Sequence, residues 1–245
     1  MNKKIIGNKI VHIDKVTSTN SYARKILMDK IPEGTVILAD IQTKGKGRKG
    51  RYWHSPEGGL WFSVILYPNI PPDEVMKITM TASISIAQIL EQTVKIDPRI
   101  KWPNDILING KKICGILTEV DAKENKINYC IVGIGLNTNN KLNEELKDIA
   151  ISIKELTDQK ISNKDLLQKI LKNFNINYTK LQDSNFKDIQ KIWNNYAQIV
   201  GKKIQVIDDD KELTGIVTGV NDNGALILDT NNRIKLISTG DLTFL

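Results

Sequence analysis

The chain has 245 residues, of which 40% are hydrophobic and 26% are charged, a composition typical of a soluble globular protein with one large domain and a small one. Its longest apolar runs, residues 60–66 and 131–136, are far shorter than the roughly 20 residues that a membrane-spanning helix needs, and no signal peptide is visible. The formal net charge of +7 permits a polyanionic partner, although lysines scattered over helices usually form a solvated face.

The residue pattern of the first part of the chain predicts three strands, a helix and a long loop. Residues 10–16 alternate as in a strand, and residues 17–19 then offer side-chain oxygens that can cap a helix over residues 20–28. Residues 35–39 and 60–67 are apolar strands, one leading into a basic loop and the other leaving it. The loop is therefore held at both ends.

The middle of the chain combines a long helix with a hairpin. Apolar residues recur at helical spacing over residues 75–90, and Pro98 ends this segment. Strands are expected at residues 100–102 and 106–108, followed by Asn109-Gly110, the dipeptide best suited to a two-residue type I′ turn. The returning strand is expected over residues 112–120.

The next predicted strand, residues 127–136, is a nearly continuous apolar run that contains Gly133 and Gly135. Glycine within a buried strand often marks close approach of a ligand. Helices are then expected over residues 162–178 and 186–196.

After Gly201 the pattern changes to short strands separated by turn signals, which predicts a small all-β barrel. We therefore expect two domains, residues 1–198 and residues 199–245. The cysteines, Cys114 and Cys130, form no paired spacings and no C-x-x-C motif, so we expect reduced thiols in a cytoplasmic protein.

Residues 44–51 form a basic, glycine-rich loop without an acid. Residues 45–50 fit G-x-G-x-x-G, but a dinucleotide-binding fingerprint opens a helix, and the Tyr52, Trp53 and Pro56 that follow start helices poorly. A Walker A loop is also excluded, because no G-K-[ST] is present. A flexible loop that wraps a phosphate-bearing ligand remains, with a solvated basic turn or a nucleic-acid patch as alternatives.

Residues 101–105, Lys-Trp-Pro-Asn-Asp, place a lysine directly before a hairpin of apolar strands. A lysine in this setting either extends its head into solvent or takes part in chemistry. Taken alone, the segment favours an exposed strand lysine beside a core tryptophan.

These motifs together are similar to those of one enzyme family. In chain order they are Ser18-Thr19-Asn20, Gln42, residues 45–51 (GKGRKGR), Trp53, Ser55-Pro56, Gly58-Gly59-Leu60, residues 101–105 (KWPND), Gly115-Ile116-Leu117 and residues 133–137 (GIGLN). In this order and spacing the chain resembles the biotin–protein ligase family over nearly its whole length. The glycine loop and the KWPND segment are the most specific of these motifs.

The resemblance implies an α+β fold like that of class II synthetases. The catalytic domain would contain a mixed, mostly antiparallel sheet with helices on one face, and residues 199–245 would form an SH3-like β-barrel. Lys46 departs from the family, whose loop usually carries arginine here, and lysine lacks the bidentate geometry of arginine. Because the chain begins almost at the first strand, we expect a monofunctional ligase that lacks the helix-turn-helix domain of the repressor members and binds no DNA.

The resemblance also implies a two-step reaction with ATP and biotin as substrates and Mg²⁺ as the metal. Biotin carboxylate attacks the α-phosphate of ATP, giving biotinyl-5′-AMP and pyrophosphate, and a lysine of a biotin carboxyl carrier protein then attacks the mixed anhydride. No protein nucleophile and no membrane are needed. Exposed strands near residues 127–136 could pair between two copies of the chain, so a homodimer is a further possibility.

By the same resemblance, Lys101 is expected to bridge biotin carboxylate and α-phosphate, while Arg48 and Arg51 bind phosphate oxygens and close the loop. These three are the expected catalytic residues. The expected biotin-binding residues are Ser18, Thr19, Asn20, Gln42, Gly45, Lys46, Gly47, Arg48, Lys101, Gly115, Gly133 and Gly135. The expected ATP-binding residues are Arg48, Arg51, Trp53, Lys101 and Asn137. The Mg²⁺ ligands are unknown, since Asp105 is either a ligand or a turn residue.

Three alternatives remain. A lipoate ligase or related acyl-transfer enzyme resembles biotin ligases in fold and also uses a pocket lysine. A nucleic-acid-binding protein would use residues 44–51 and the barrel, and its binding would depend on salt. A ligase homologue that only senses biotin is disfavoured by the presence of Lys101, Arg48 and Arg51.

Overall fold

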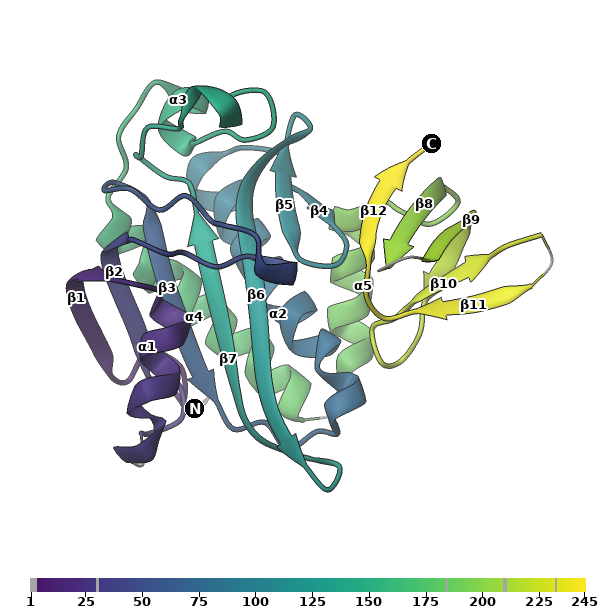
Figure 1. Cartoon of the computed structure of the whole chain (residues 1–245), viewed down its shortest axis with the longest axis horizontal. Coiled ribbons are helices and arrows are strands. Elements are labelled where there is room, and N and C mark those ends of the chain that lie inside the picture. The colour runs from purple at the N-terminus through teal and green to yellow at the C-terminus, as the bar shows by residue number, and fades with distance from the viewer. Residues whose placement is uncertain (1–3, 30, 184, 209–210, 232) are drawn as a thin grey trace.

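A computed structural model describes residues 4–29, 31–183, 185–208, 211–231 and 233–245, and it contains two sheets (Figure 1). The larger sheet has seven strands in the order β1-β2-β3-β7-β6-β5-β4, and the smaller has five in the order β11-β10-β9-β8-β12. The strands are β1 Ile10–Val16, β2 Val36–Gln42, β3 Leu60–Leu66, β4 Arg99–Lys101, β5 Asp105–Ile108, β6 Lys111–Lys123, β7 Lys126–Leu136, β8 Lys203–Asp208, β9 Lys211–Val220, β10 Leu226–Asp229, β11 Ile234–Ile237 and β12 Asp241–Phe244. The helices are α1 Thr19–Ile26, α2 Met76–Ile89, α3 Ile153–Thr157, α4 Asn163–Gln182 and α5 Phe186–Ala197.

The large sheet is mixed and mostly antiparallel, as the resemblance implied. Strands β1 and β2 run parallel, and the other pairs of described strands in this sheet are antiparallel. The hairpin predicted at Asn109-Gly110 joins β5 to β6, with φ angles of 50° and 79°. These positive angles are the ones that a type I′ turn requires, so this prediction is confirmed.

Both faces of the central strands are covered. Every side chain of β3 is buried. Ile65 packs with Ala23 of α1 on one face, whereas its neighbours Val64 and Leu66 belong to the core that α2, α4 and α5 build on the other. The three longer helices therefore lie behind the sheet and the short α1 in front of it (Figure 1). None of the described helices is long and apolar enough to cross a membrane.

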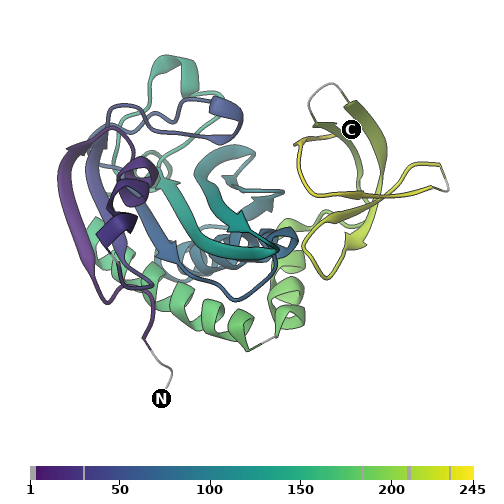
Figure 2. The same ribbon diagram turned by 60° about the horizontal axis from the view of Figure 1, so that its bottom comes forward.

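The C-terminal domain is a five-stranded antiparallel sheet whose buried residues belong to the same core cluster as those of the large domain, and it fits the expected SH3-like barrel (Figure 2). It rests on the large domain through a turn at residues 221–224. Gly224 has a φ angle of 85°, and a Cβ added there would lie 2.8 Å from Met76 Cγ. Asn223 Nδ2 donates to Asp73 Oδ2 at 2.8 Å. The turn therefore docks at the start of helix α2.

The two thiols, Cys114 and Cys130, are free and buried in the core of the large domain. Burial raises the pKa of both thiols well above the usual range, and the carboxylate of Asp105 raises the pKa of Cys114 further. Because the thiolate is the reactive form, we expect iodoacetamide to modify neither cysteine in the folded protein and both in guanidinium chloride. Intact-protein mass spectrometry checks this, and rapid labelling of the native protein would contradict it.

Candidate functional site

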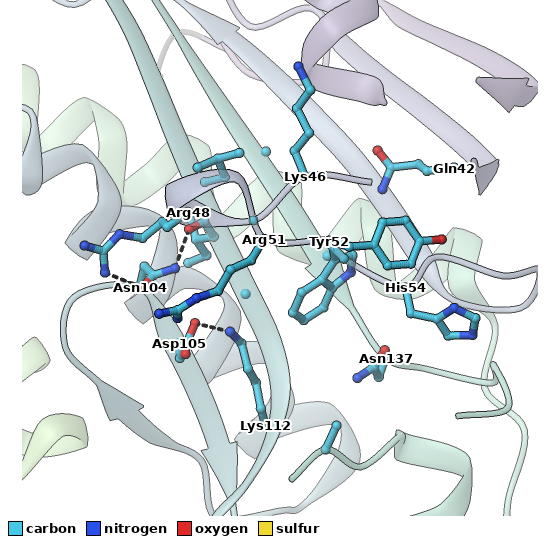
Figure 3. Close-up of a pocket in the computed structure, with 18 of the residues that line it drawn as sticks. Gln42, Lys46, Arg48, Arg51, Tyr52, His54, Asn104, Asp105, Lys112 and Asn137 are labelled. Carbon is cyan, nitrogen blue, oxygen red and sulfur yellow. Dashed lines mark hydrogen bonds and ion pairs between the residues drawn. The ribbon is translucent and has the colours of Figure 1, made fainter. Parts of the chain in front are cut away.

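A cavity with a volume of about 400 Å³ lies over β6 and β7, on the same face of the sheet as α1 (Figure 3). The glycine loop with residues 52–54, the segment 142–150 and Asp241 of the C-terminal domain surround it. It is lined by all the expected site residues except Gly45 and Lys101. The sequence motifs, which are far apart in the chain, therefore meet at one place.

Glycines in β6 and β7 form the floor of this cavity. Gly115 and Gly135 are direct partners in the antiparallel register. A Cβ added at Gly135 would lie 2.3 Å from Trp53 Nε1, and one at Gly115 would lie 2.9 Å from Trp53 Cζ3. At Gly133 it would lie 2.2 Å from Asn20 Oδ1. Close approach of a ligand was expected at Gly133 and Gly135, whereas the groups that approach all three glycines here are the chain's own indole and amide side chains.

One end of the cavity is a buried network of neutral polar groups. The backbone N–H and the hydroxyl of Thr19 both donate to Gln42 Oε1, at 2.8 and 3.1 Å, and Gln42 Nε2 lies 2.9 Å from Ser55 Oγ. Ser63 Oγ donates to Asn20 Oδ1 at 2.6 Å. These contacts fix the side chains before any ligand arrives, which lowers the entropic cost of binding. Ser55 belongs to the motifs that carry the resemblance but had no expected role, and Ser63 was not predicted from the sequence.

Ser18 and Asn20 complete this polar end. Ser18 is the N-cap residue of α1, but its side chain makes no capping hydrogen bond. Asn20 Nδ2 donates to Glu119 Oε2 at 2.8 Å. Both residues are almost completely buried, with exposed fractions of 2% for Ser18 and 3% for Asn20.

The opposite end carries cations. Arg48 Nη1 donates to Asn104 Oδ1 at 3.2 Å, and Lys112 Nζ lies 2.7 Å from Asp105 Oδ1 and 5.1 Å from the centre of the Trp53 ring. Figure 3 shows the Lys112 amine directed to the Asp105 carboxylate and the Arg48 guanidinium beside Asn104. Asp105 is thus the ion-pair partner of a cavity lysine. The KWPND segment supplies the acceptors that orient Arg48 and Lys112.

Lys101, which the resemblance predicts to bridge biotin carboxylate and α-phosphate, lies outside the cavity lining. It lies in β4, the edge strand of the sheet, with β5 between it and the glycine-bearing strand β6, and it does not line the cavity. Gly45 is also outside the lining: its carbonyl accepts the Trp53 N–H at 2.9 Å, and a Cβ there would lie 2.3 Å from Trp53 O. Its role is to allow the backbone of the loop to pass close to Trp53.

A β-bulge explains why Lys112 was missed. In a regular strand, residues 112 and 115 are three apart and point to opposite faces. The register shifts between Ile106 and Leu107, so that Asp105 pairs with Gly115 but Leu107 pairs with Lys112. Cross-strand partners share a face, and Asp105 and Leu107 share one as well, so the shift brings Lys112 onto the cavity face beside Gly115.

The segment 142–150 borders the cavity and was not predicted. Its apolar side chains Leu142, Leu146 and Ile149 line the opening, and Ile149 is 63% exposed. The Lys112 N–H donates to Ile149 O at 2.8 Å, which ties this segment to the strand that carries the cavity lysine. An exposed apolar side chain beside a cavity, such as that of Ile149, is typical of a surface that a ligand covers.

Two family models match the chain. One, described as the biotin/lipoate A/B protein ligase family, matches residues 12–137, and another, described as the biotin protein ligase C terminal domain, matches residues 199–244. The chain belongs to the biotin/lipoate A/B protein ligase family. Its barrel corresponds to the C-terminal module of that family's biotin protein ligases.

Individual relatives agree with this assignment. The chain is 39% identical to the bifunctional ligase/repressor BirA of Bacillus subtilis over 98% of this chain and 75% of the relative. It is 29% identical to the biotin–[acetyl-CoA-carboxylase] ligase of Paracoccus denitrificans over 94% of this chain and 98% of the relative. The structure of biotin protein ligase from Aquifex aeolicus in complex with biotin and ATP superposes with a TM-score of 0.81 at 30% identity, covering 97% of this chain and 99% of that one.

Proposed function

We infer that this chain is a biotin–protein ligase that activates biotin with ATP, releasing pyrophosphate, and transfers it from biotinyl-5′-AMP to a lysine of a carrier protein. The observation that carries this inference is the composition of the cavity, which joins a buried neutral polar network to a cationic end. Biotin has the same division, with an uncharged ureido ring at one end and a carboxylate at the other. The family assignment and the relatives named biotin ligases support the same conclusion.

The ureido ring binds at the neutral end. Thr19, Asn20 and Gln42 offer donors and acceptors that are already held by hydrogen bonds, Thr19 with Gln42 and Asn20 with Ser63, and they require little rearrangement. Ser18 lies at the same end, and the glycine floor with the Trp53 indole contacts the apolar part of the ligand. Lys46, Gly47 and Arg48 of the loop cover it.

The carboxylate lies at the cationic end, where the first chemical step takes place. A carboxylate and an α-phosphate about 4 Å apart repel each other by about 4 kcal/mol at an effective dielectric constant near 20. Lys112 and Arg48 offset this repulsion, since both line the cavity and are oriented by Asp105 and Asn104. We assign to Lys112 the bridging role that the sequence suggested for Lys101.

The second step needs no nucleophile from the enzyme. The carrier amine attacks the acyl carbon of the mixed anhydride, the acyl–oxygen bond to the phosphate breaks, and AMP leaves with the bonding electrons. The loop and segment 142–150 exclude water from the anhydride until the carrier arrives. The acceptor is a biotin carboxyl carrier domain, as the names of relatives such as the Paracoccus enzyme suggest.

The nucleotide lies toward Arg51, Trp53 and Asn137. Asn137 lines the cavity, and its Oδ1 accepts from Asn140 Nδ2 at 3.1 Å, which fixes the orientation of its amide. Mg²⁺ is expected to accompany ATP. The described residues include no cluster of three or more His, Cys, Asp or Glu side chains suited to a metal, and Asp105 is paired with Lys112. A metal held mainly by phosphate oxygens and water, as Mg²⁺ often is, suits this site best.

Several finer points remain predictions. These are the boundary between residues 198 and 199, a homodimer, the absence of DNA binding and a cytoplasmic location. Biotin rather than lipoate is the proposed substrate, because relatives such as the Paracoccus denitrificans enzyme are named biotin ligases.

The test is a biotin-dependent exchange of labelled pyrophosphate into ATP, followed by mass spectrometry of a biotin carboxyl carrier domain incubated with the enzyme. We expect exchange with biotin and not with lipoate, and a single biotin adduct on the carrier. Exchange that required lipoate would favour the lipoate ligase alternative. Binding of biotin without exchange would show a sensor rather than an enzyme.

A further inference from the structure

The turn between β11 and β12 reaches from the C-terminal domain to the glycine loop. Arg48 Nη1 donates to Gly240 O at 3.1 Å, and Arg48 Nη2 donates to Thr239 Oγ1 at 3.3 Å. Both terminal nitrogens of Arg51 donate to the carboxylate of Asp241. Asp241 Oδ1 also lies 4.0 Å from Arg48 Nη1. One carboxylate of the barrel thus meets both arginines expected to bind phosphate.

Asp241 is an anion in this position. Partial burial alone would raise the pKa of its carboxyl group, but the hydrogen bonds and charge of Arg51, with the charges of Arg48 and Lys49, outweigh it and lower the pKa. The side chain is 36% exposed and lines the cavity. The carboxylate is therefore both charged and close to the ligand.

The loop needs such a partner because it has no acid of its own. Residues 44–51 include five cationic side chains, which repel one another and favour an open, disordered loop. The paired donation of Arg51 to a carboxylate fixes the plane of its guanidinium as well as its position. An acid from the other domain can therefore set both the shape of the loop and the direction of its arginines.

We propose that Asp241 is a positioning residue for the adenylation step, which orients Arg51 and Arg48 for the triphosphate of ATP and makes the C-terminal domain part of the nucleotide site. This rests on the proposed ligase function. Asp241 does not touch the reacting atoms. Its effect is exerted through the two arginines, so it should alter binding of ATP more than binding of biotin, whose ureido ring lies at the neutral end.

Another contact between the domains allows this role to be distinguished from simple docking of the barrel. The turn at residues 221–224 packs on Met76, and Asn223 bonds to Asp73, without involving the loop arginines. A variant that weakens this contact loosens the barrel and leaves Asp241 beside Arg51. Asn223→Ala is therefore the matched control for Asp241→Asn.

The experiment measures biotin-dependent pyrophosphate exchange for Asp241→Asn, Asp241→Glu and Asn223→Ala in the full chain. We expect Asp241→Asn to raise the KM for ATP about threefold to tenfold, the range expected when a partly exposed, charge-assisted pair is lost. The KM for biotin should rise less than the KM for ATP, because the contacts to the ureido ring do not involve the arginines, and Asp241→Glu should recover part of the affinity for ATP. Trypsin should cut within residues 44–51 faster in ligand-free Asp241→Asn than in the wild type.

The possible results distinguish failure of the positioning role of Asp241 from failure of the proposed ligase function. An unchanged KM for ATP in Asp241→Asn overturns the positioning role, and a lower one overturns it by showing that the carboxylate competes with phosphate. An equal rise of the KM for ATP in Asn223→Ala also overturns the positioning role, because docking of the barrel alone would then explain the loss of ATP affinity. If the wild type shows no biotin-dependent exchange, the proposed function fails, and the tryptic rates alone support or overturn the ordering of the loop by Asp241.

Discussion

Replacement of Lys112 by alanine is expected to lower the rate of biotin-dependent pyrophosphate exchange by about two to three orders of magnitude, the usual loss for a preorganised donor at a developing charge. Lys112 is oriented by Asp105 at 2.7 Å and lies over the Trp53 ring, at the cationic end of the cavity. Lys101→Ala should keep the rate within about threefold of the wild type, as expected of a charge away from the reacting groups. The pair of variants decides which lysine bridges the two anions.

Loss of Lys112 also leaves a carboxylate without its cation, which can destabilise the protein independently of catalysis. The double variant Asp105→Asn, Lys112→Met removes both charges and controls for this effect. It should unfold near the wild-type temperature and still lack exchange activity. Exchange by Lys112→Ala at the wild-type rate, or its loss in Lys101→Ala, would contradict the assignment.

The sequence was most informative where local chemistry determines structure. Asn109-Gly110 predicts its own turn because few other residues adopt two successive positive φ angles, and the hairpin is present. Gly133 and Gly135, which interrupt an apolar strand, indicated close approach, and the distances from an added Cβ to Asn20 and Trp53 show why no side chain fits there. The identity of the approaching groups needed the fold, since both lie in distant segments.

Lys112 illustrates what periodicity cannot predict. Strict alternation from Gly115 places Lys112 on the opposite face, and only the register shift in β5 and β6 reverses this. The segment 142–150 was missed for a related reason, since it carries no regular strand or helix pattern through the cavity lining. No pattern or motif in the sequence predicts the contact of Asp241 with the loop arginines, because this contact depends on how the two domains pack.

Arg48→Ala is expected to reduce adenylate formation by about two orders of magnitude, because Arg48 is the other cation that can offset the charge of the carboxylate and phosphate. Its side chain is 21% exposed and is held by Asn104 at 3.2 Å and Gly240 at 3.1 Å. A guanidinium fixed in this way needs little reorganisation when charge develops at the phosphate. Single-turnover formation of biotinyl-5′-AMP, followed with labelled ATP, measures the effect.

Lys44→Ala is the matched control, because Lys44 is an exposed cation of the same loop and does not line the cavity. If general attraction of ATP by the basic loop were responsible, the two variants would lose similar affinity and both would respond to salt. If the fixed guanidinium is responsible, Arg48→Ala loses its rate even at saturating ATP, whereas Lys44→Ala retains it. A full rate for Arg48→Ala at saturating ATP would limit Arg48 to binding, and Lys112 would then be the main cation acting on the reacting groups.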